Sequence, residues 1–439
     1  MDILQRAAQA ADAGELYEEL REGLQVSFRG GEIERVASQA VLGRALRVIS
    51  NGKLGFASTA GEEADGLVKA ALASAAHGDA APFSFPTPAS PNPVEVLDPQ
   101  VESTTVDELV TWGEQAVHAV GEAFPEVIVD VSLAKGTQDV RLANTAGGEL
   151  RERRSYLTMS LEAQWIREGD IYLVWQSRAV RRRADLDPER LTASLLRYLR
   201  WGERVAVPPA RTPPVVFTPQ GATVLLLPLL MGFSGLSVHM GTSPLQGKLG
   251  QQVFHPSLTL TDEGGRPFAP GSRSFDDEGL PVGTLPLVEA GVARNFFYDL
   301  RTAALAGAEP TGNGTRSGLL RGGGFRTPPS PGPRNIVLQP EEGSLEDFVA
   351  DISEGMVVAG VLGLGQGNVA SGAFSNNVGV GFAVRDGKVV GRVKGTMIAG
   401  NAYQVLRDGL KQIGGEPEWV FGTALLPALL VEGVHVVTR

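Results

Sequence analysis

The sequence predicts an α+β fold in two domains, and three features of the chain indicate it. The first half alternates amphipathic helical segments with strands. The second half consists mainly of short apolar strands separated by glycine-rich turns. Between the two halves, residues 205–214 (VAVPPARTPP) contain repeated prolines and show no apolar periodicity. We therefore expect an α+β N-terminal domain over residues 1–207 and a β-rich, glycine-rich C-terminal domain over residues 208–439.

Capping residues and apolar periodicity predict four helices in the first half. The clearest begins at Thr104 or Thr105, with two acidic residues in its first turn. Another begins with Asp187 as its cap and Pro188 at its first helical position. The four helices are expected over residues 2–11, 62–76, 104–123 and 187–201.

The strands of the first half are predicted from apolar alternation and from turn residues. Residues 15–58 are expected to form a series of strands, GLQVSFRG, GEIERVAS and LGRALRVIS, followed by a hairpin at Asn51-Gly52 into KLGFAS. Residues 127–134 alternate as a further strand. Residues 150–166 and 171–180 are expected to form one long hairpin.

The second half contains one apolar helix, predicted over Gly221–Met231, and a stretch of glycine-rich strands, Gly355–Asn401. Within that stretch Asp386-Gly387 is a strong hairpin signal. Glycine inside a strand costs stability and is tolerated where another backbone or a ligand comes close. The stretch therefore forms either a surface that binds an extended peptide by strand addition, or a closely packed core.

Composition excludes several classes of function. The net charge is −11 and the pI is about 5.1, so a role in neutralising nucleic-acid phosphates is not expected. The absence of cysteine excludes disulfides and thiolate chemistry. No apolar run approaches the roughly 20 residues of a membrane span, and the N-terminus does not resemble a secretion signal. We expect a cytoplasmic protein.

Candidate chemical motifs are few. No two of the five histidines lie within ten residues of each other, so no helical metal-binding pair exists. The alternative is a weaker metal site built from His239 and His255 with Asp276, Asp277 or Glu278. Those three acids form the turn SFDDEGLP, which is more simply a solvated acidic turn. The segment PTGNGTR around Asn313 is expected to be polar and flexible, and GLGQGN lacks the helix that a phosphate loop needs.

Several separated strings resemble one family, the TldD/PmbA family, once described as modulators of DNA gyrase. In chain order they are GEIERV, LGRALRVISNGKLGFAST, LVKAALASA, NTAGGEL, LQGKLGQQVF, SFDDEGLP, PTGNGTR, GLGQGNVASGAFSNNVGVGF and TMIAGN. The resemblance covers nearly the whole chain. It implies an α+β N-terminal domain, a β-rich C-terminal domain, and extended or unfolded peptides as the substrate of an assembled dimer.

The resemblance also distinguishes two branches. TldD-type subunits are zinc peptidases with an HExxxH helix and a C-terminal cysteine ligand, whereas TldE/PmbA-type subunits pair with them and lack these ligands. This chain has Leu227-Pro228-Leu229-Leu230-Met231-Gly232 at about the place of the zinc motif, and no cysteine. It is therefore similar to the TldE/PmbA branch, and neither catalytic nor metal-binding residues carry over to it.

The favoured interpretation is a non-catalytic subunit of a TldD/TldE metallopeptidase complex, inactive alone, with zinc in the TldD-type partner and none in this chain. The complex would be a heterodimer or a higher assembly, and the chain could form a homodimer when it is alone. The alternatives are a non-enzymatic homodimeric regulatory or binding protein, or a self-sufficient peptidase with an unrecognised metal site. Residues expected to line a peptide cleft are Asp276, Asp277, Glu278, Asn313, Gln366, Asn368, Ser371, Ser375 and Asn376.

Overall fold

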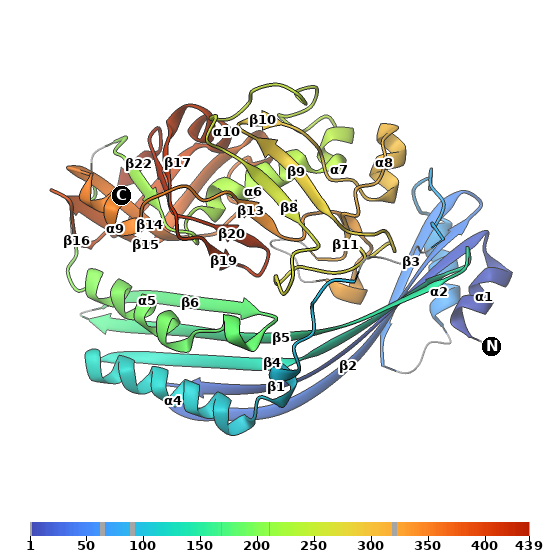
Figure 1. Cartoon of the computed structure of the whole chain (residues 1–439), viewed down its shortest axis with the longest axis horizontal. Coiled ribbons are helices and arrows are strands. Elements are labelled where there is room, and N and C mark those ends of the chain that lie inside the picture. The colour runs from blue at the N-terminus through green and yellow to red at the C-terminus, as the bar shows by residue number, and fades with distance from the viewer. Residues whose placement is uncertain are drawn as a thin grey trace.

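The computed structural model describes residues 2–61, 66–87, 93–167, 169–209, 211–317 and 323–438. The chain forms a mixed α+β fold, as predicted. Figure 1 shows the long strands of the first half as one curved sheet lying beneath the β-rich second half. None of the helices in these ranges is both long enough and apolar enough to cross a membrane. The boundary at residues 207 and 208 stays a prediction.

The first half is built on an antiparallel six-stranded sheet with the strand order β3-β2-β1-β4-β5-β6. The strands reach 19 residues in length, and alternate side chains point to opposite faces. On β1, Leu16, Val26 and Phe28 are buried towards the helices, whereas Tyr17 is buried on the other face. The strands are β1 (Ala13–Arg29), β2 (Glu32–Ser50), β3 (Lys53–Ala60), β4 (Val127–Asn144), β5 (Glu149–Arg167) and β6 (Asp170–Val180).

Helices cover this sheet at both ends. At one end α4 buries Leu109, Gly113, Ala116 and Val120, spaced as one helical face requires. Its N-terminus carries the predicted cap, with Thr105 and Glu108 forming a reciprocal capping box. The helices of this half are α1 (Ile3–Ala10), α2 (Leu67–Ala75), α3 (Pro99–Ser103), α4 (Val106–Ala123), the 3₁₀ turn η1 (Arg183–Asp185) and α5 (Pro188–Trp201).

The predicted hairpins are confirmed and one strand assignment is wrong. Asn51 and Gly52 both have positive φ, as a two-residue hairpin turn requires, and they join β2 to β3. The hairpin of β5 and β6 is also present. However, GEIERVAS and LGRALRVIS form a single strand, β2, because both segments pair continuously with β1.

The second half contains two larger sheets packed around α6. One has the order β10-β9-β8-β13-β20-β19, and the other has the order β18-β21-β7-β14-β15-β17-β22 with β16 beside β15. The first comprises β8 (Leu260–Glu263), β9 (Thr284–Glu289), β10 (Val292–Ala293), β13 (Ile336–Leu338), β19 (Glu418–Val420) and β20 (Ala424–Leu426). The second comprises β7 (Val215–Phe217), β14 (Glu354–Leu362), β15 (Ala373–Arg385), β16 (Lys388–Arg392), β17 (Thr396–Asn401), β18 (Leu410–Ile413), β21 (Leu429–Val431) and β22 (His435–Thr438).

Short elements connect these sheets. A two-stranded ladder joins β11 (Gly314–Thr315) to β12 (Ser330–Pro331). The predicted apolar helix is α6 (Thr223–Phe233), and it is followed by α7 (Gly235–His239), α8 (Leu300–Ala306), α9 (Leu345–Ala350) and α10 (Ala402–Gln404). Single turns are η2 (Gly324–Arg326), η3 (Val369–Ser371) and the π-helical η4 (Val405–Gly409).

The glycine-rich strands β14 and β15 form a closely packed core. Both are interior strands, since β14 lies between β7 and β15, and β15 lies between β14 and the strands β16 and β17. Most of their backbone groups therefore have partners already, so strand addition by a peptide along this stretch is not supported. A Cβ atom at Gly360 or Gly379 would lie 3.0 to 3.2 Å from the Trp175 ring of β6. The glycines thus let the two halves of the chain approach each other.

Helix α5 completes the contact between the halves. Its residues Tyr198 and Trp201 place their rings 5.6 and 5.2 Å from the ring of Phe382 on β15. Figure 1 shows α5 alongside β6, at the edge of the curved sheet that faces the second half. Aromatic pairs at these separations add to the hydrophobic contribution of the buried area.

Replacing Gly360 with alanine should lower the free energy of unfolding. The added Cβ atom would lie 3.0 and 3.3 Å from two ring atoms of Trp175 at a buried position, and overpacking costs about 1–3 kcal/mol. The matched control is Gly121→Ala, on the exposed side of α4 with no atom within 4 Å, which should stabilise the helix by about 0.5–1 kcal/mol. Urea unfolding followed by circular dichroism distinguishes the two; equal effects would contradict the packing argument.

Candidate functional site

A pocket of about 700 Å³ lies between α6, a proline-rich segment and the glycine loop that follows β14. Helix α6 contributes Leu227, Leu230 and Met231. The facing wall is residues 327–333, which contain four prolines, and Phe297 lies beside them. Residues 315–317 and the loop residues Gly365, Gly367, Asn368, Val369 and Ala370 complete the lining.

The described lining is apolar with scattered hydroxyl and amide groups. Arg316 is its one titratable residue, and its guanidinium is bound by other groups of the protein. Nη1 of Arg316 donates a hydrogen bond to the carbonyl of Thr327 at 2.8 Å, and the guanidinium carbon lies 4.4 Å from the centre of the Tyr17 ring on β1. The lining residues in the described ranges include no His, Cys, Asp or Glu, so they do not fit a zinc ion.

Helix α6 is apolar on every side because it crosses the core of the second half. All of its residues except Met231 are buried, and Met231 is 38% exposed at the pocket. Pro228 lies inside the helix, and the hydroxyl of Tyr403 donates to its carbonyl at 3.0 Å. A Cβ atom at Gly232 would lie 2.0 Å from that hydroxyl oxygen, so the close contact requires glycine. The helix therefore presents only apolar side chains at the pocket.

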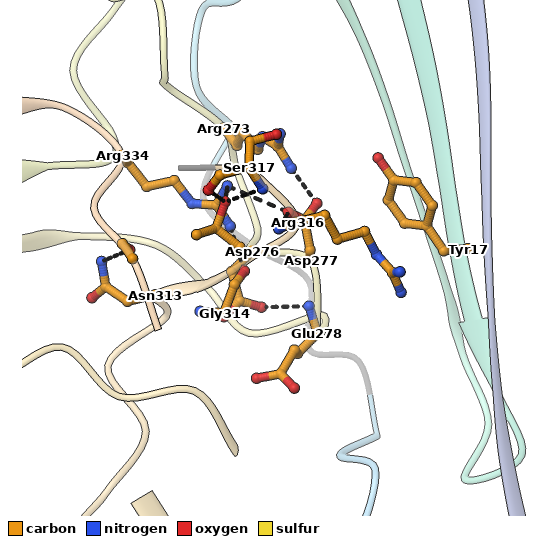
Figure 2. A network of polar contacts seen from close by, with 12 residues as sticks. Tyr17, Arg273, Asp276, Asp277, Glu278, Asn313, Gly314, Arg316, Ser317 and Arg334 are labelled. Carbon is orange, nitrogen blue, oxygen red and sulfur yellow. Dashed lines mark hydrogen bonds and ion pairs between the residues drawn. The ribbon is translucent and has the colours of Figure 1, made fainter. Parts of the chain in front are cut away.

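Two buried carboxylates hold the polar wall of the pocket in place. Asp276 accepts hydrogen bonds from the backbone amides of Glu278 and Leu280 through Oδ1 and from Gly314 through Oδ2, each at 2.9 Å. Asp277 accepts one from the amide of Arg316 at 2.7 Å through Oδ2. Figure 2 shows these acids beside Gly314 and Arg316. The acidic turn thus anchors β11, whose Thr315 lines the pocket.

Arginines compensate the charge of Asp277. Arg273 forms an ion pair with its Oδ1, and Nη1 of Arg334 lies 3.6 Å from its Oδ2. Burial raises the pKa of Asp277, but Arg273, Arg334 and Arg316 outweigh this effect and hold its pKa below the usual range. This carboxylate is therefore ionised across the physiological pH range.

Arg47 of β2 joins the acidic turn to the N-terminal sheet. Its Nε and Nη2 atoms donate to the two carboxylate oxygens of Glu15 on β1 at 2.9 and 2.8 Å, and its Nη1 donates to Glu278 at 2.7 Å. All three side chains are at most 2% exposed. One guanidinium is thus shared by two carboxylates in the interior. Burial, opposed by Arg47 and reinforced by the charge of Asp276, raises the pKa of Glu278 to about 8.

The residues predicted to line a cleft fall into two groups. Five are buried and hold neighbouring groups in place: the three acids, Asn313 and Asn376. Asn313 donates a hydrogen bond to Asp262 at 2.6 Å, and Asn376 donates one to the carbonyl of Gly363 at 2.7 Å. The predictions of a solvated acidic turn and a flexible PTGNGTR segment are therefore wrong. Both segments are buried, and arginines and backbone amides pair with the acids in the interior. The others, Gln366, Asn368, Ser371 and Ser375, lie in or beside the glycine loop, and Asn368 alone of the nine lines the pocket.

The alternative metal site does not form. Nδ1 of His255 accepts a hydrogen bond from the amide of Ser257 at 3.2 Å, and the three acids are held by arginines and amides as described above. Across the part of the chain that the structure describes, no three His, Cys, Asp or Glu side chains form a group suited to a metal ion.

The role of Leu230, Met231 and Phe297 in the pocket was not predicted from the sequence, nor were the proline wall and the arginine partners of the acids. One signal in the sequence could have pointed to the pocket: Leu227–Gly232 stand at about the place where TldD-type chains have their zinc motif. Arg47 carries no local signal as a partner of Glu278, because the two residues are 231 residues apart in sequence, whereas Arg273 lies only four residues before Asp277.

Replacing Arg47 with methionine should destabilise the protein by about 3–5 kcal/mol, because Glu15 and Glu278 would both lose their buried cation. The control is Arg44→Met on the same two strands. Arg44 faces Glu18, which also pairs with Arg141 and is 20% exposed, so a loss of at most about 1 kcal/mol is expected. Chemical denaturation measures both losses of stability. Similar losses in the two variants would show that the buried ion pairs of Arg47 matter no more than the partly exposed pair of Arg44.

Glu278 should make stability depend on pH. Its pKa is raised in the folded protein, so its stabilising contribution is complete below the unfolded pKa near 4.5 and is lost as pH rises through about 8. The stability of the wild type relative to Glu278→Gln should therefore fall between pH 5 and 8, by at most about 1.4 kcal/mol per pH unit. Thermal unfolding of both proteins across this range tests the sign, and a constant difference would show that Glu278 is ionised throughout.

Comparison with known proteins supports a family assignment. Residues 210–438, more than half of the chain, match the sequence model of the PmbA/TldA metallopeptidase C-terminal domain, and residues 14–76 match that of PmbA/TldA metallopeptidase domain 1. An uncharacterized protein of Methanocaldococcus jannaschii is 26% identical over 88% of both chains. A metalloprotease TldD homolog of Haemophilus influenzae is 29% identical, over 38% of this chain and 33% of its own length.

Solved structures share the fold. TldE from Thermococcus kodakarensis superposes with a TM-score of 0.87 at 24% identity, covering 99% of both chains. A candidate modulator of a DNA gyrase from Thermotoga maritima superposes with a TM-score of 0.82, also at 24% identity and 99% coverage of both chains. With the matched domains, these similarities agree with the resemblance drawn from the sequence. The chain belongs to the TldD/PmbA family of metallopeptidase-like proteins.

Proposed function

We propose that this chain is a non-catalytic, TldE-type subunit of a two-subunit metallopeptidase that acts on extended peptides. The observation that carries the proposal is the face of α6 at the pocket. At about the place where the catalytic branch of the family has its HExxxH motif, this helix presents Leu227, Leu230 and Met231. Such side chains bind apolar groups and do not activate water, so zinc and general-base chemistry are assigned to a TldD-type partner.

In this proposal the pocket binds part of the peptide substrate. Apolar side chains on one wall and prolines on the other suit an apolar side chain of a peptide in extended form. The prolines have no backbone N–H and add no donors to this wall, and β12 within it is already paired with β11. The pocket's volume of about 700 Å³ is in the range of small-ligand sites.

The support for this proposal is twofold. The family is metallopeptidase-like, and the fold is similar to that of TldE from Thermococcus kodakarensis. A mixture of the chain, a TldD-type subunit, zinc and an unstructured peptide should therefore show cleavage that the chain alone does not. Turnover by the chain alone, abolished by a chelator, would overturn the proposal.

Replacing Met231 with glutamate should weaken peptide binding about fivefold or more, because a charge would replace an apolar contact worth about 1 kcal/mol. The matched control is Met240→Glu, 65% exposed at the end of α7 and outside the pocket lining. Anisotropy of a fluorescent, leucine-rich unstructured peptide measures both affinities. Equal affinities would place peptide binding elsewhere.

A further inference from the structure

The glycine loop, residues 363–372, forms one side of the pocket between α6 and the proline wall. Its sequence is GLGQGNVASG, which contains no charged residue. Gly365, Gly367 and Asn368 lie in the pocket lining, and all three are exposed. Gly365 and Gly367 have φ of +93° and +103°, values that residues with a side chain rarely adopt. At these two positions only backbone atoms can face the pocket.

The backbone amides of this part of the loop are free. Within the described ranges, the amides of Gly365, Gly367 and Asn368 donate no hydrogen bond to another group of the protein. The amide of Gln366, between the two glycines, donates to the carbonyl of Gly363 at 3.0 Å and closes a tight turn. The loop therefore offers a ligand several N–H donors that have no competing acceptor in the protein.

Both ends of the loop are held in place by asparagines. Asn376 of β15 donates from Nδ2 to the carbonyl of Gly363 at 2.7 Å, so this carbonyl accepts two hydrogen bonds. At the other end Asn401 donates to the carbonyl of Ser371 at 2.9 Å. Because the ends are fixed before a ligand arrives, binding to the free amides orders few further residues and little conformational entropy is lost.

The surroundings of the loop favour an anionic group next to an apolar one. The lining residues in the described part of the chain include no Asp or Glu, although the whole chain carries a net charge of −11. Helix α6 packs against η3 at the end of the loop, and its Leu230 and Met231 lie in the same lining. A ligand that fits both features has a group that only accepts hydrogen bonds beside an apolar side chain.

We propose that the glycine loop binds the C-terminal carboxylate of a peptide whose last side chain is apolar and lies against Leu230 and Met231. A carboxylate only accepts hydrogen bonds, and its bonds with N–H groups are about twice as strong as those of neutral acceptors. Capture of a peptide C-terminus by backbone amides is a recurring mode of recognition. The inference rests on the proposed function and narrows its substrates to peptides with a free, apolar C-terminus.

A matched set of peptides tests the carboxylate. An unstructured peptide that ends in leucine and is labelled at its N-terminus is compared as the free acid and as the C-terminal amide. Fluorescence anisotropy with the full chain should show about tenfold tighter binding of the free acid, because the amide is neutral and adds donors of its own. A free acid that ends in glutamate should bind about fivefold more weakly than the leucine peptide, because α6 is apolar.

Removal of one amide tests the loop. Asn368→Pro removes an N–H group at a residue whose φ is −88°, close to the value of about −65° that proline requires. The matched control, Asn368→Ala, also loses the side chain but keeps the N–H group. The preference for acid over amide should fall to about threefold or less in the proline variant and stay near tenfold in the alanine variant. Circular dichroism and the melting temperature check that both variants are folded.

Two results would overturn the inference and leave the proposed function intact. One is equal affinity of the wild type for the acid and the amide, and the other is an unchanged preference in Asn368→Pro. In both cases Met231→Glu would still weaken binding of the leucine peptides. If neither the acid nor the amide binds the wild type, the inference and the proposed role of the pocket in peptide binding are both wrong.

Discussion

The buried contact of Arg47 with Glu15 and Glu278 is the interaction on which much of this structure depends. It is one of the points at which the long sheet of the first half meets the acidic turn of the second half, together with the hydrogen bond from the Ser274 amide to Glu152. A buried ion pair contributes little compared with well-packed apolar residues, but it penalises any arrangement that leaves one partner alone. The contact therefore favours one relative placement of the two halves. Trp175 and α5 then fill the remaining space with apolar contacts.

This placement also shapes the pocket. Asp276 and Asp277 bind the backbone of Gly314 and Arg316, and these residues continue directly into the pocket wall. The acids therefore act on the pocket through the backbone and not through contact with a ligand. Apart from Arg316, the titratable groups lie behind the wall, and the lining itself is mainly apolar. The ionic groups thus hold the pocket wall in place without facing the pocket.

Local sequence signals predicted the fold better than the site. The turn at Asn51-Gly52 and the cap at Asp187 were predictable because the residues that define them are adjacent in sequence. The single strand β2 was missed because its continuity is set by pairing with β1 and not by its own pattern. Burial of Asp276, Asp277 and Glu278 could not be inferred, since several of their partners are distant in sequence: Gly314 is 38 residues from Asp276, Arg316 is 39 residues from Asp277 and Arg47 is 231 residues from Glu278. The glycine-rich strands were correctly singled out, and the structure shows them as a packed core because Trp175 occupies the space that side chains would need.

The distance in sequence between Arg47 and Glu278 has a consequence for biosynthesis. Their contact closes a loop of 231 residues, and the pairing of β7 with β21 near the C-terminus closes a loop of similar length. Long loops of this kind slow folding, since the ends must meet before any contact is gained. During translation Glu15 and Arg47 emerge and pair with each other long before Glu278 is made. The two halves can therefore dock only after nearly the whole polypeptide has left the ribosome. Until then, Nη1 of Arg47, the atom that binds Glu278 in the folded protein, lacks this partner.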